Sequence, residues 1–263
     1  MTREVALVTG ASSGIGEAFA RQLAAKGKPL VLVARRGDRL EALAGEIRNA
    51  SGVDVQVIAK DLGHPDSRRQ LFEETERRGL AVDWLVNNAG FGTCGTFTAL
   101  PLEREIEEIR LNVEALVELT HRYLPGMVAR RHGVIVNLGS TGSFAPVPYM
   151  ATYGGTKAFV LSFSEALAAE VSRAGVQILA LCPGATRTEF QAVAGVRHAT
   201  DRLPGVAFMT ADEVVAQAIK AAESGRRTLV PGILNALTVE SVRLMPRRMV
   251  TAVTGGIFQP RSA

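Results

Sequence analysis

The chain has 263 residues, of which 47% are hydrophobic and 21% charged, and its formal net charge is +4. This composition excludes a disordered chain, and the length is enough to bury a core without disulfide or metal staples. The basic residues form no long run and aromatic residues make up only 5% of the chain, which argues against nucleic-acid binding.

Short apolar runs alternate with helical patterns from one end of the chain to the other. Most of these runs are continuously apolar, as expected of parallel strands that are covered on both faces. We predict strands at 5–8, 30–33, 53–58, 84–86, 134–136, 176–180 and 228–230, and helices at 15–26, 38–50, 66–78, 101–129, 149–173 and 211–223. Repeated β-α-β units predict an α/β fold: a doubly wound, Rossmann-like parallel sheet of about seven strands with helices on both faces. No linker or repeat divides the chain, so residues 1–263 are predicted to form a single domain.

The first predicted strand ends in a glycine-rich turn, Thr-Gly-Ala-Ser-Ser-Gly-Ile-Gly, at residues 9–16. Glycines allow a tight turn and a close approach of the backbone to a pyrophosphate, and the following helix offers free N–H groups. The strand–turn–helix context is the one that this motif requires. The predicted cofactor contacts in this turn are Gly10, Ser12, Ser13, Gly14, Ile15 and Gly16.

The second predicted strand ends in Ala34, Arg35 and Arg36. Sheets that bind NAD carry an acid near this point, which hydrogen-bonds the ribose 2′-hydroxyl. Here alanine holds that place, and a guanidinium can bind a 2′-phosphate with charge-assisted bonds. We therefore predict NADP(H) as the cofactor. The alternative is that Arg35 and Arg36 form a solvated turn.

The glycine spacing resembles that of the short-chain dehydrogenase/reductase family. The resemblance implies that Asp61 and Leu62 lie at the adenine, and that Asn88, Ala89 and Gly90 lie near the cofactor. It also implies that the segment with Pro183, Gly184, Thr186 and Thr188 holds the nicotinamide carboxamide. The matching motifs cover about residues 3 to 231.

Tyr153 and Lys157 are spaced to share one helix face. A nearby ammonium lowers the pKa of a phenol, so Tyr153 is predicted to exchange a proton with a substrate oxygen. The family resemblance implies that Ser140 polarises this oxygen and that Lys157 also binds the nicotinamide ribose, so that Tyr153 and Lys157 both contact the cofactor. It further implies that Asn112 holds a water that links Lys157 to bulk solvent.

The predicted function is NADP(H)-dependent hydride transfer to or from the carbonyl or hydroxyl of a small apolar substrate, with ketone or 3-oxoacyl reduction favoured. One alternative is a non-catalytic NADP(H)-binding regulatory protein, although this chain keeps Ser140, Tyr153 and Lys157. Another is a nucleotide-sugar epimerase or dehydratase, which usually has another glycine spacing and a larger C-terminal region.

Two segments in the C-terminal part of the chain are predicted to lie outside the core of the fold. Residues 189–209 are rich in apolar side chains and are predicted to be a mobile substrate lid. Residues 233–258 form a C-terminal extension with apolar residues at helical spacing and arginines between them. This extension could contact a membrane, pack on a partner subunit or cover the substrate pocket. Packing against protein is favoured, because the resemblance implies a homodimer or homotetramer.

The remaining features of the sequence predict a cytoplasmic protein. Cys94 and Cys182 are too few for a disulfide framework and are predicted to be buried thiols. The first residues run straight into a strand without a signal peptide, and no stretch has the about 18 apolar residues that span a bilayer. No metal site is predicted.

Overall fold

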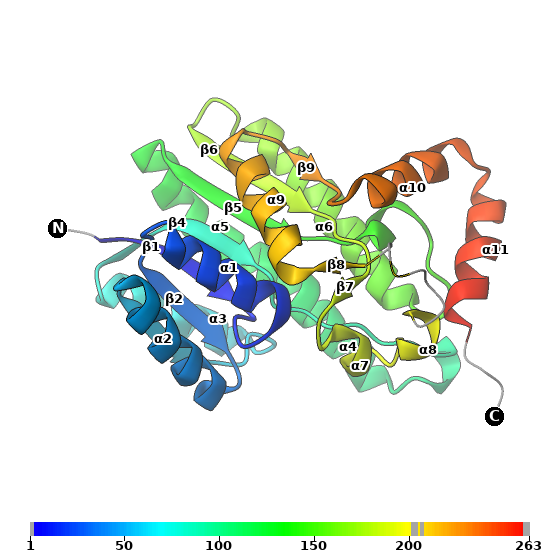
Figure 1. Cartoon of the computed structure of the whole chain (residues 1–263), viewed down its shortest axis with the longest axis horizontal. Coiled ribbons are helices and arrows are strands. Elements are labelled where there is room, and N and C mark those ends of the chain that lie inside the picture. Colours follow the sequence, from blue (N-terminus) through cyan, green and yellow to red (C-terminus); the bar gives the residue numbers. More distant parts are fainter. Residues whose placement is uncertain (1–2, 201–204, 206–207, 260–263) are drawn as a thin grey trace.

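The computed structural model describes residues 3–200, 205 and 208–259. Within these residues, seven parallel strands form the central sheet in the order β3-β2-β1-β4-β5-β6-β9 (Figure 1). Their bounds are Arg3–Thr9 (β1), Leu30–Ala34 (β2), Val55–Ala59 (β3), Leu80–Asn87 (β4), Gly133–Leu138 (β5), Val176–Leu181 (β6) and Thr228–Leu229 (β9). The order reverses direction between β1 and β4, which confirms the predicted doubly wound sheet.

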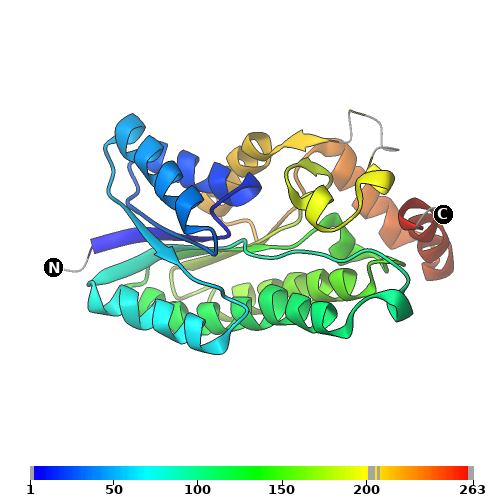
Figure 2. The same cartoon turned by 90° about the horizontal axis from the view of Figure 1, so that it is seen from below.

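Helices cover both faces of this sheet (Figure 2). One layer holds α1 (Gly14–Ala25), α2 (Gly37–Ser51) and α9 (Ala211–Glu223), and the other holds α3 (Pro65–Arg77), α4 (Leu102–Ile109), α5 (Ala115–Arg130) and α6 (Ala151–Glu170). The neighbouring residues Leu7 and Val8 of β1 enter opposite hydrophobic cores. Because both faces of the strands are buried, their sequences are continuously apolar.

Two predicted helices differ from those in the structure. The helix predicted at 101–129 is divided by a π-helical segment, Arg110–Glu114, between α4 and α5. The helix predicted at 149–173 begins only at Ala151 and ends at Glu170. Tyr149 has a φ of 66°, in the left-handed region, and so it cannot continue a right-handed helix.

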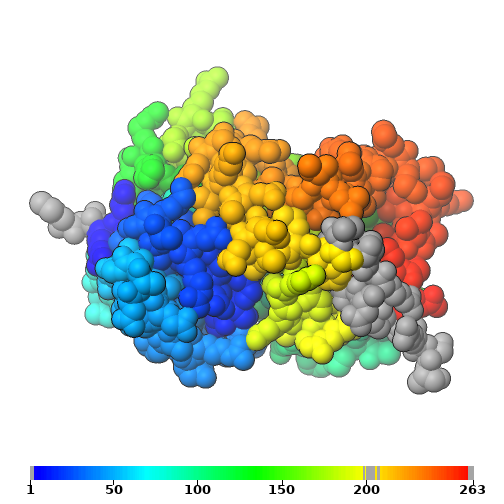
Figure 3. All heavy atoms as spheres, in the orientation of Figure 1, coloured from blue at the N-terminus to red at the C-terminus, as the bar shows by residue number. Residues whose placement is uncertain are grey.

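The segments beyond the sheet lie at its carboxyl end. Short elements here are β7 (Thr186–Arg187), which pairs with β8 (Met209–Thr210), α7 (Phe190–Val193), α8 (Arg197–Thr200), and the 3-10 turns Phe97–Ala99 and Thr141–Phe144. The predicted lid at 189–209 therefore includes α7 and α8, and its residues 201–204 and 206–207 lie outside the described residues. The C-terminal extension forms α10 (Ile233–Leu244) and α11 (Arg247–Phe258), at one end of the molecule (Figure 3). Across the described part of the chain, no helix is long and apolar enough to cross a bilayer.

Candidate active site

A cavity of about 470 Å³ follows the edge of the sheet where the parallel strands end. Of the predicted site residues, those in its wall are Gly10, Ser12, Ser13, Gly14, Ile15, Arg35, Arg36, Asp61, Leu62, Asn88, Ala89, Gly90, Ser140, Tyr153, Lys157, Pro183, Gly184, Thr186 and Thr188. Gly16 and Asn112 were predicted as well but lie behind this wall. The tertiary fold thus brings together residues that are far apart in the sequence, because the carboxyl ends of parallel strands meet at one edge.

The glycine turn leaves the start of α1 open toward the cavity. Gly10 and Gly14 have φ values of 65° and 60°, which favour glycine. The N-cap residue Ser13 makes no side-chain capping bond in the described chain, so the first N–H groups of α1 remain available for an anion. Gly16 is required for close packing, because a Cβ at this position would lie 2.3 Å from the Gly10 carbonyl oxygen. Its missing side chain lets α1 pack against the turn.

Thr9 and Asn88 hold this turn against β4. The Thr9 hydroxyl donates to the Val86 carbonyl at 3.0 Å and accepts from the backbone N–H groups of Asn88 at 2.9 Å and Ala89 at 3.0 Å. The Asn88 amide donates to the Thr9 carbonyl at 2.9 Å. Asn88 therefore stabilises the turn as well as lining the cavity, and Thr9 supports the turn without lining the cavity.

The two arginines after β2 occupy different positions. Arg36 donates to the Ser12 hydroxyl from Nη2 at 3.0 Å and to the Ser13 hydroxyl at 2.9 Å. Its Nη1 also pairs with Glu189 Oε2 at 2.9 Å. Arg35 has a side chain that is 69% exposed and lies 3.9 Å from Asp61 Oδ2. Arg36 is thus fixed at the glycine turn, and a carboxylate from a distant segment, Glu189, lies beside it.

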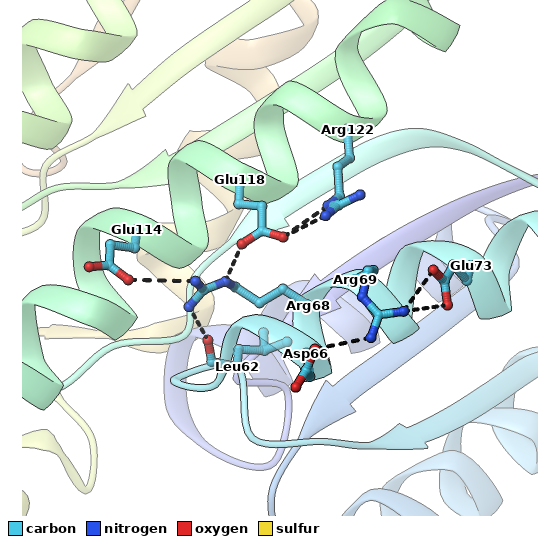
Figure 4. A network of polar contacts seen from close by, with 8 residues as sticks. All are labelled: Leu62, Asp66, Arg68, Arg69, Glu73, Glu114, Glu118 and Arg122. Carbon is cyan, nitrogen blue, oxygen red and sulfur yellow. Dashed lines mark hydrogen bonds and ion pairs between the residues drawn. The ribbon is translucent and has the colours of Figure 1, made fainter.

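An ion-pair network around the buried Arg68 supports the segment at Leu62 (Figure 4). The Arg68 side chain is 4% exposed and donates from Nη1 to the Leu62 carbonyl at 3.1 Å. On the other side it pairs with Glu114 at 3.5 Å and with Glu118. Arg122 shares the Glu118 carboxylate. The network ties α3 to α5 and so fixes the backbone that leads Leu62 into the cavity wall.

Ser140 is held by the turn that follows β5. Its hydroxyl accepts from the Gly142 backbone N–H at 3.1 Å, and its own N–H donates to the Ser143 hydroxyl at 3.1 Å. This reciprocal capping fixes the position of the Ser140 side chain. The residue therefore reaches the cavity from a rigid turn.

Tyr153 and Lys157 project from α6 into the cavity wall. The Lys157 ammonium donates to the Leu138 carbonyl at 2.7 Å and lies 5.7 Å from the centroid of the Tyr153 ring. Burial raises the pKa of Tyr153 to about 12, although a hydrogen bond with Ser140 opposes the rise. Burial lowers the pKa of Lys157 to about 8. The pKa shift of Tyr153 is thus opposite to the predicted one, because desolvation dominates and Lys157 points to a carbonyl.

Asn112 lies in the π-helical segment and is almost fully buried. Its amide donates to the Phe91 carbonyl at 2.9 Å and to the Thr156 hydroxyl at 3.1 Å, and its oxygen accepts from the Phe91 N–H at 3.1 Å. A Cβ on Gly90 would lie 2.7 Å from Asn112 Oδ1 and 3.7 Å from Lys157 Nζ. Asn112 is therefore close to Lys157 and fixes the neighbouring Phe91 backbone, while the water predicted for it stays a prediction.

The cavity beside Tyr153 is apolar. Phe190 lies against Tyr153 with ring centroids 5.4 Å apart, and Phe258 reaches the same cluster from the end of α11. The cluster includes the buried residues Val147, Met150, Ala194 and Val196. The Thr254 hydroxyl donates to the Pro146 carbonyl at 2.9 Å, which fixes α11 over this end of the cavity. The end of α11 therefore lines this cavity, while packing on a partner subunit or contact with a membrane stays a prediction.

The family model described as short chain dehydrogenase matches residues 4–197, which is most of the chain. The chain belongs to this family. The predicted resemblance is thereby confirmed, and this short-chain dehydrogenase is an oxidoreductase of a family that uses a nicotinamide coenzyme.

Relatives of this short-chain dehydrogenase are named for several kinds of substrate, among them 3-oxoacyl-CoA, hydroxysteroids and L-sorbose. It is 40% identical over 176 residues to the very-long-chain 3-oxoacyl-CoA reductase of Mycosarcoma maydis, covering 66% of this chain and 50% of that protein. It is 33% identical to the 7beta-hydroxysteroid dehydrogenase of Collinsella aerofaciens, covering 70% of each. The NADPH complex of a short-chain dehydrogenase from Sphingobium yanoikuyae has a TM-score of 0.82 at 36% identity, covering 99% of this chain and 98% of that one. The chain spans about half the length of the first curated reductases that it matches.

Several wall residues of this short-chain dehydrogenase were not predicted. Phe91 and Arg104 line the cavity, with the Arg104 guanidinium 3.8 Å from the Phe91 ring centroid. Phe91 follows Gly90 directly, so its place could have been inferred from the motif, whereas nothing in the sequence indicates Arg104. Both cysteines are free thiols, but only Cys182 is buried as predicted, whereas Cys94 is half-buried. Burial raises the pKa of Cys182 to about 12.

Proposed function

We propose that this short-chain dehydrogenase reduces an apolar ketone or 3-oxoacyl group with NADPH, and that Tyr153 is the general acid. The observation that carries the choice of coenzyme is the position of Arg36. Its guanidinium is fixed by Ser12 and Ser13 at the phosphate turn, while Ala34 ends β2 where an NAD-binding sheet has an acid. A planar guanidinium at this place suits a 2′-phosphate.

The groups in the cavity wall suit a dinucleotide along its length. The open N-terminus of α1 and Ser12 would bind the pyrophosphate, Leu62 would lie at the adenine, and Thr186 would lie at the nicotinamide. When bound, the nicotinamide coenzyme supplies the hydride for the carbonyl carbon. The related short-chain dehydrogenase of Sphingobium yanoikuyae was solved in complex with NADPH, which supports this assignment.

The chain's own residues supply the proton. We assign to Ser140 a hydrogen bond to the substrate oxygen, and to Tyr153 the transfer of its phenolic proton to that oxygen as the negative charge develops. The raised pKa of Tyr153 keeps the phenol protonated at neutral pH, which suits reduction. Lys157 then returns a proton to Tyr153. The apolar walls around Phe190 exclude water from this exchange.

The substrate is assigned from the character of the cavity beside Tyr153. Its walls are apolar on the sides of Phe190 and Phe258, and Arg104 adds one cation. Relatives named for 3-oxoacyl-CoA, hydroxysteroid and bulky ketone substrates support an apolar carbonyl compound, whereas those named for L-sorbose and gluconate do not.

The test has two steps with the purified full chain. Fluorescence titration with NADPH and NADH should give a lower Kd for NADPH by at least about tenfold, the value of one charge-assisted hydrogen bond. Loss of NADPH absorbance should then occur with some member of a panel of an aromatic ketone, a steroid ketone and a 3-oxoacyl thioester. NADPH binding without turnover of any of them would favour the non-catalytic regulatory protein instead. Tighter binding of NADH would overturn the choice of coenzyme.

A further inference from the structure

Two buried carboxyl groups lie behind the cavity wall, and the proposed reaction does not use them. Glu105 and Glu108 project from α4 and are 4% and 0% exposed. The Thr93 hydroxyl contacts both, with 2.6 Å to Glu105 Oε1 and 2.9 Å to Glu108 Oε2. The Thr152 hydroxyl donates to the other oxygen of Glu105. The four side chains form one polar cluster, to which α4, α6 and the loop after β4 contribute.

A count of hydrogens shows which carboxyl group is protonated. The Thr93 hydroxyl has one hydrogen but two short contacts with carboxyl oxygens, so one of these contacts needs a hydrogen from a carboxyl group. Glu105 accepts on both oxygens, whereas Glu108 Oε1 has no partner among the described residues. A buried carboxylate with an unpaired oxygen is costly. The hydrogen therefore belongs on Glu108, which donates it to Thr93.

The electrostatic surroundings agree with this count. Burial raises the pKa of Glu108 to about 7, Glu105 adds to the rise, and Thr93 and Lys157 oppose it. The charged and titratable groups that interact with Glu108 include Glu105 on its own helix and both Lys157 and Tyr153 on α6. Glu108 in turn raises the pKa of both Tyr153 and Lys157. The protonation of Glu108 is thereby coupled to the protonation of Tyr153 and Lys157.

The position of Glu108 on its helix places it near Asn112, which lies close to Lys157. It lies four residues before Asn112, so the two side chains share a face at the junction of α4 and the π-helical segment. Asn112 in turn contacts Thr156 and lies beside Lys157 across Gly90. π-Helical turns inside longer helices are frequent at functional sites.

We propose that Glu108 stores the proton that recharges Tyr153 and Lys157 after each reduction. The proposal rests on the proposed function. Tyr153 gives its proton to the substrate oxygen, the Lys157 ammonium returns one to Tyr153, and the Glu108 carboxyl group gives its proton to the Lys157 amine. Glu108 is left as a carboxylate, which solvent reprotonates, and no electrons pass through it. Because it acts through Lys157, Glu108 is a positioning residue.

The kinetic test compares Glu108→Gln with the wild type from about pH 6 to 8.5. Glutamine keeps the shape and a donor for Thr93 but stores no proton. We expect kcat to fall about tenfold at pH 6, within the range of general acid–base effects, with unchanged KM. The ratio should approach one above pH 8, where the wild-type carboxyl group is ionised. The exposed Glu103→Gln on the same helix is the matched control and should change nothing. A constant ratio at every pH would indicate a structural role and overturn the proposal.

An infrared titration tests the stored proton without turnover. The wild type should show the carbonyl stretch of a protonated carboxyl group at pH 6, which disappears as the pH rises through about 7 and is absent from Glu108→Gln. Glu105→Gln, which removes the negative neighbour, should shift this transition to lower pH. The Glu105→Gln variant still tests the assignment if Glu108→Gln does not fold. No such band in the wild type, or a transition unmoved in Glu105→Gln, would refute the assignment. If the wild type reduces no ketone but shows the band, the proposed function fails while the protonation of Glu108 stands.

Discussion

The Arg36 guanidinium and the Glu189 carboxylate form an ion pair of 2.9 Å that joins the end of β2 to the segment after β7. Arg39 binds the other oxygen of Glu189 at 2.7 Å. Hydrogen bonds from Arg39 and Arg36 lower the pKa of Glu189 to about 2, so this carboxylate is charged at neutral pH. A 2′-phosphate at Arg36 would have to share its cation with Glu189.

This competition predicts opposite effects on NADPH affinity. Arg36→Gln should weaken NADPH binding by about tenfold or more, as expected from the loss of charge-assisted bonds, and change NADH binding little. Glu189→Gln should strengthen NADPH binding several-fold. Fluorescence titration with both coenzymes measures this, with Arg69→Gln on α3 as the control for a surface ion pair. Equal losses for NADPH and NADH in Arg36→Gln would show that Arg36 does not bind the 2′-phosphate.

Removal of the Tyr153 hydroxyl should stop the reaction and leave coenzyme binding intact. Tyr153→Phe keeps the ring contact with Phe190 but has no proton to donate, so kcat should fall by about 10²-fold or more. Tyr123→Phe is the matched control, because that hydroxyl binds Thr75 in the core, away from the cavity. Stopped-flow or steady-state NADPH oxidation gives the rates. A Tyr153→Phe variant with most of its activity would remove this residue as the acid.

Two glycines on different helices predict opposite results for the same substitution. A Cβ on Gly16 would lie 2.3 Å from the Gly10 carbonyl oxygen, whereas a Cβ on Gly155 meets no described atom within 4 Å. Gly16→Ala should therefore lower the stability and displace the phosphate turn. Gly155→Ala should raise the free energy of unfolding by about 0.5–1 kcal/mol, because it removes a glycine from a helix interior. Urea unfolding and NADPH titration measure both effects, and equal stability of the two variants would contradict this explanation.

Phe258 should affect the substrate rather than the coenzyme. Its side chain packs in the apolar cluster with Tyr153 and Phe190. Phe258→Ala should raise KM for large apolar ketones by about tenfold or more, since burying an aromatic side chain is worth a few kcal/mol, and leave the Kd of NADPH unchanged. Phe97→Ala, at a site that is 60% exposed, is the control. An unchanged KM across the ketone panel would mean that α11 does not form part of the substrate site.

The raised pKa of Glu108 also predicts how stability depends on pH. The folded protein keeps the proton up to about pH 7, while an unfolded chain releases it near 4.5, the ordinary pKa of a glutamate. The wild type should therefore lose stability as pH rises from about 4.5 through 7, by ~3 kcal/mol at most at about 1.36 kcal/mol per pKa unit. Glu108→Gln has no such loss, so its Tm relative to wild type should rise between pH 5 and pH 8. A difference in Tm that is independent of pH would contradict the shift.

The sequence by itself determined the order of elements and the family. Runs such as Leu30–Val33 are apolar throughout because both faces of the sheet are covered, and this local pattern is sufficient to locate strands. The glycine turn and the Tyr153–Lys157 spacing are also local, since each concerns residues within one turn or one helix. These features could be read without knowledge of distant contacts.

Only the tertiary structure decided the features that depend on contacts between distant segments. The pKa of Tyr153 follows from its burial among residues of other elements, and so its direction could not be derived from the lysine four residues away. The approach of Glu189 to Arg36 joins residues that are 153 positions apart. The break in the helix at Asn112 and the hydrogen shared by Thr93 and Glu108 likewise depend on packing. Periodicity reports which face of an element is buried, but it does not report which side chains meet there.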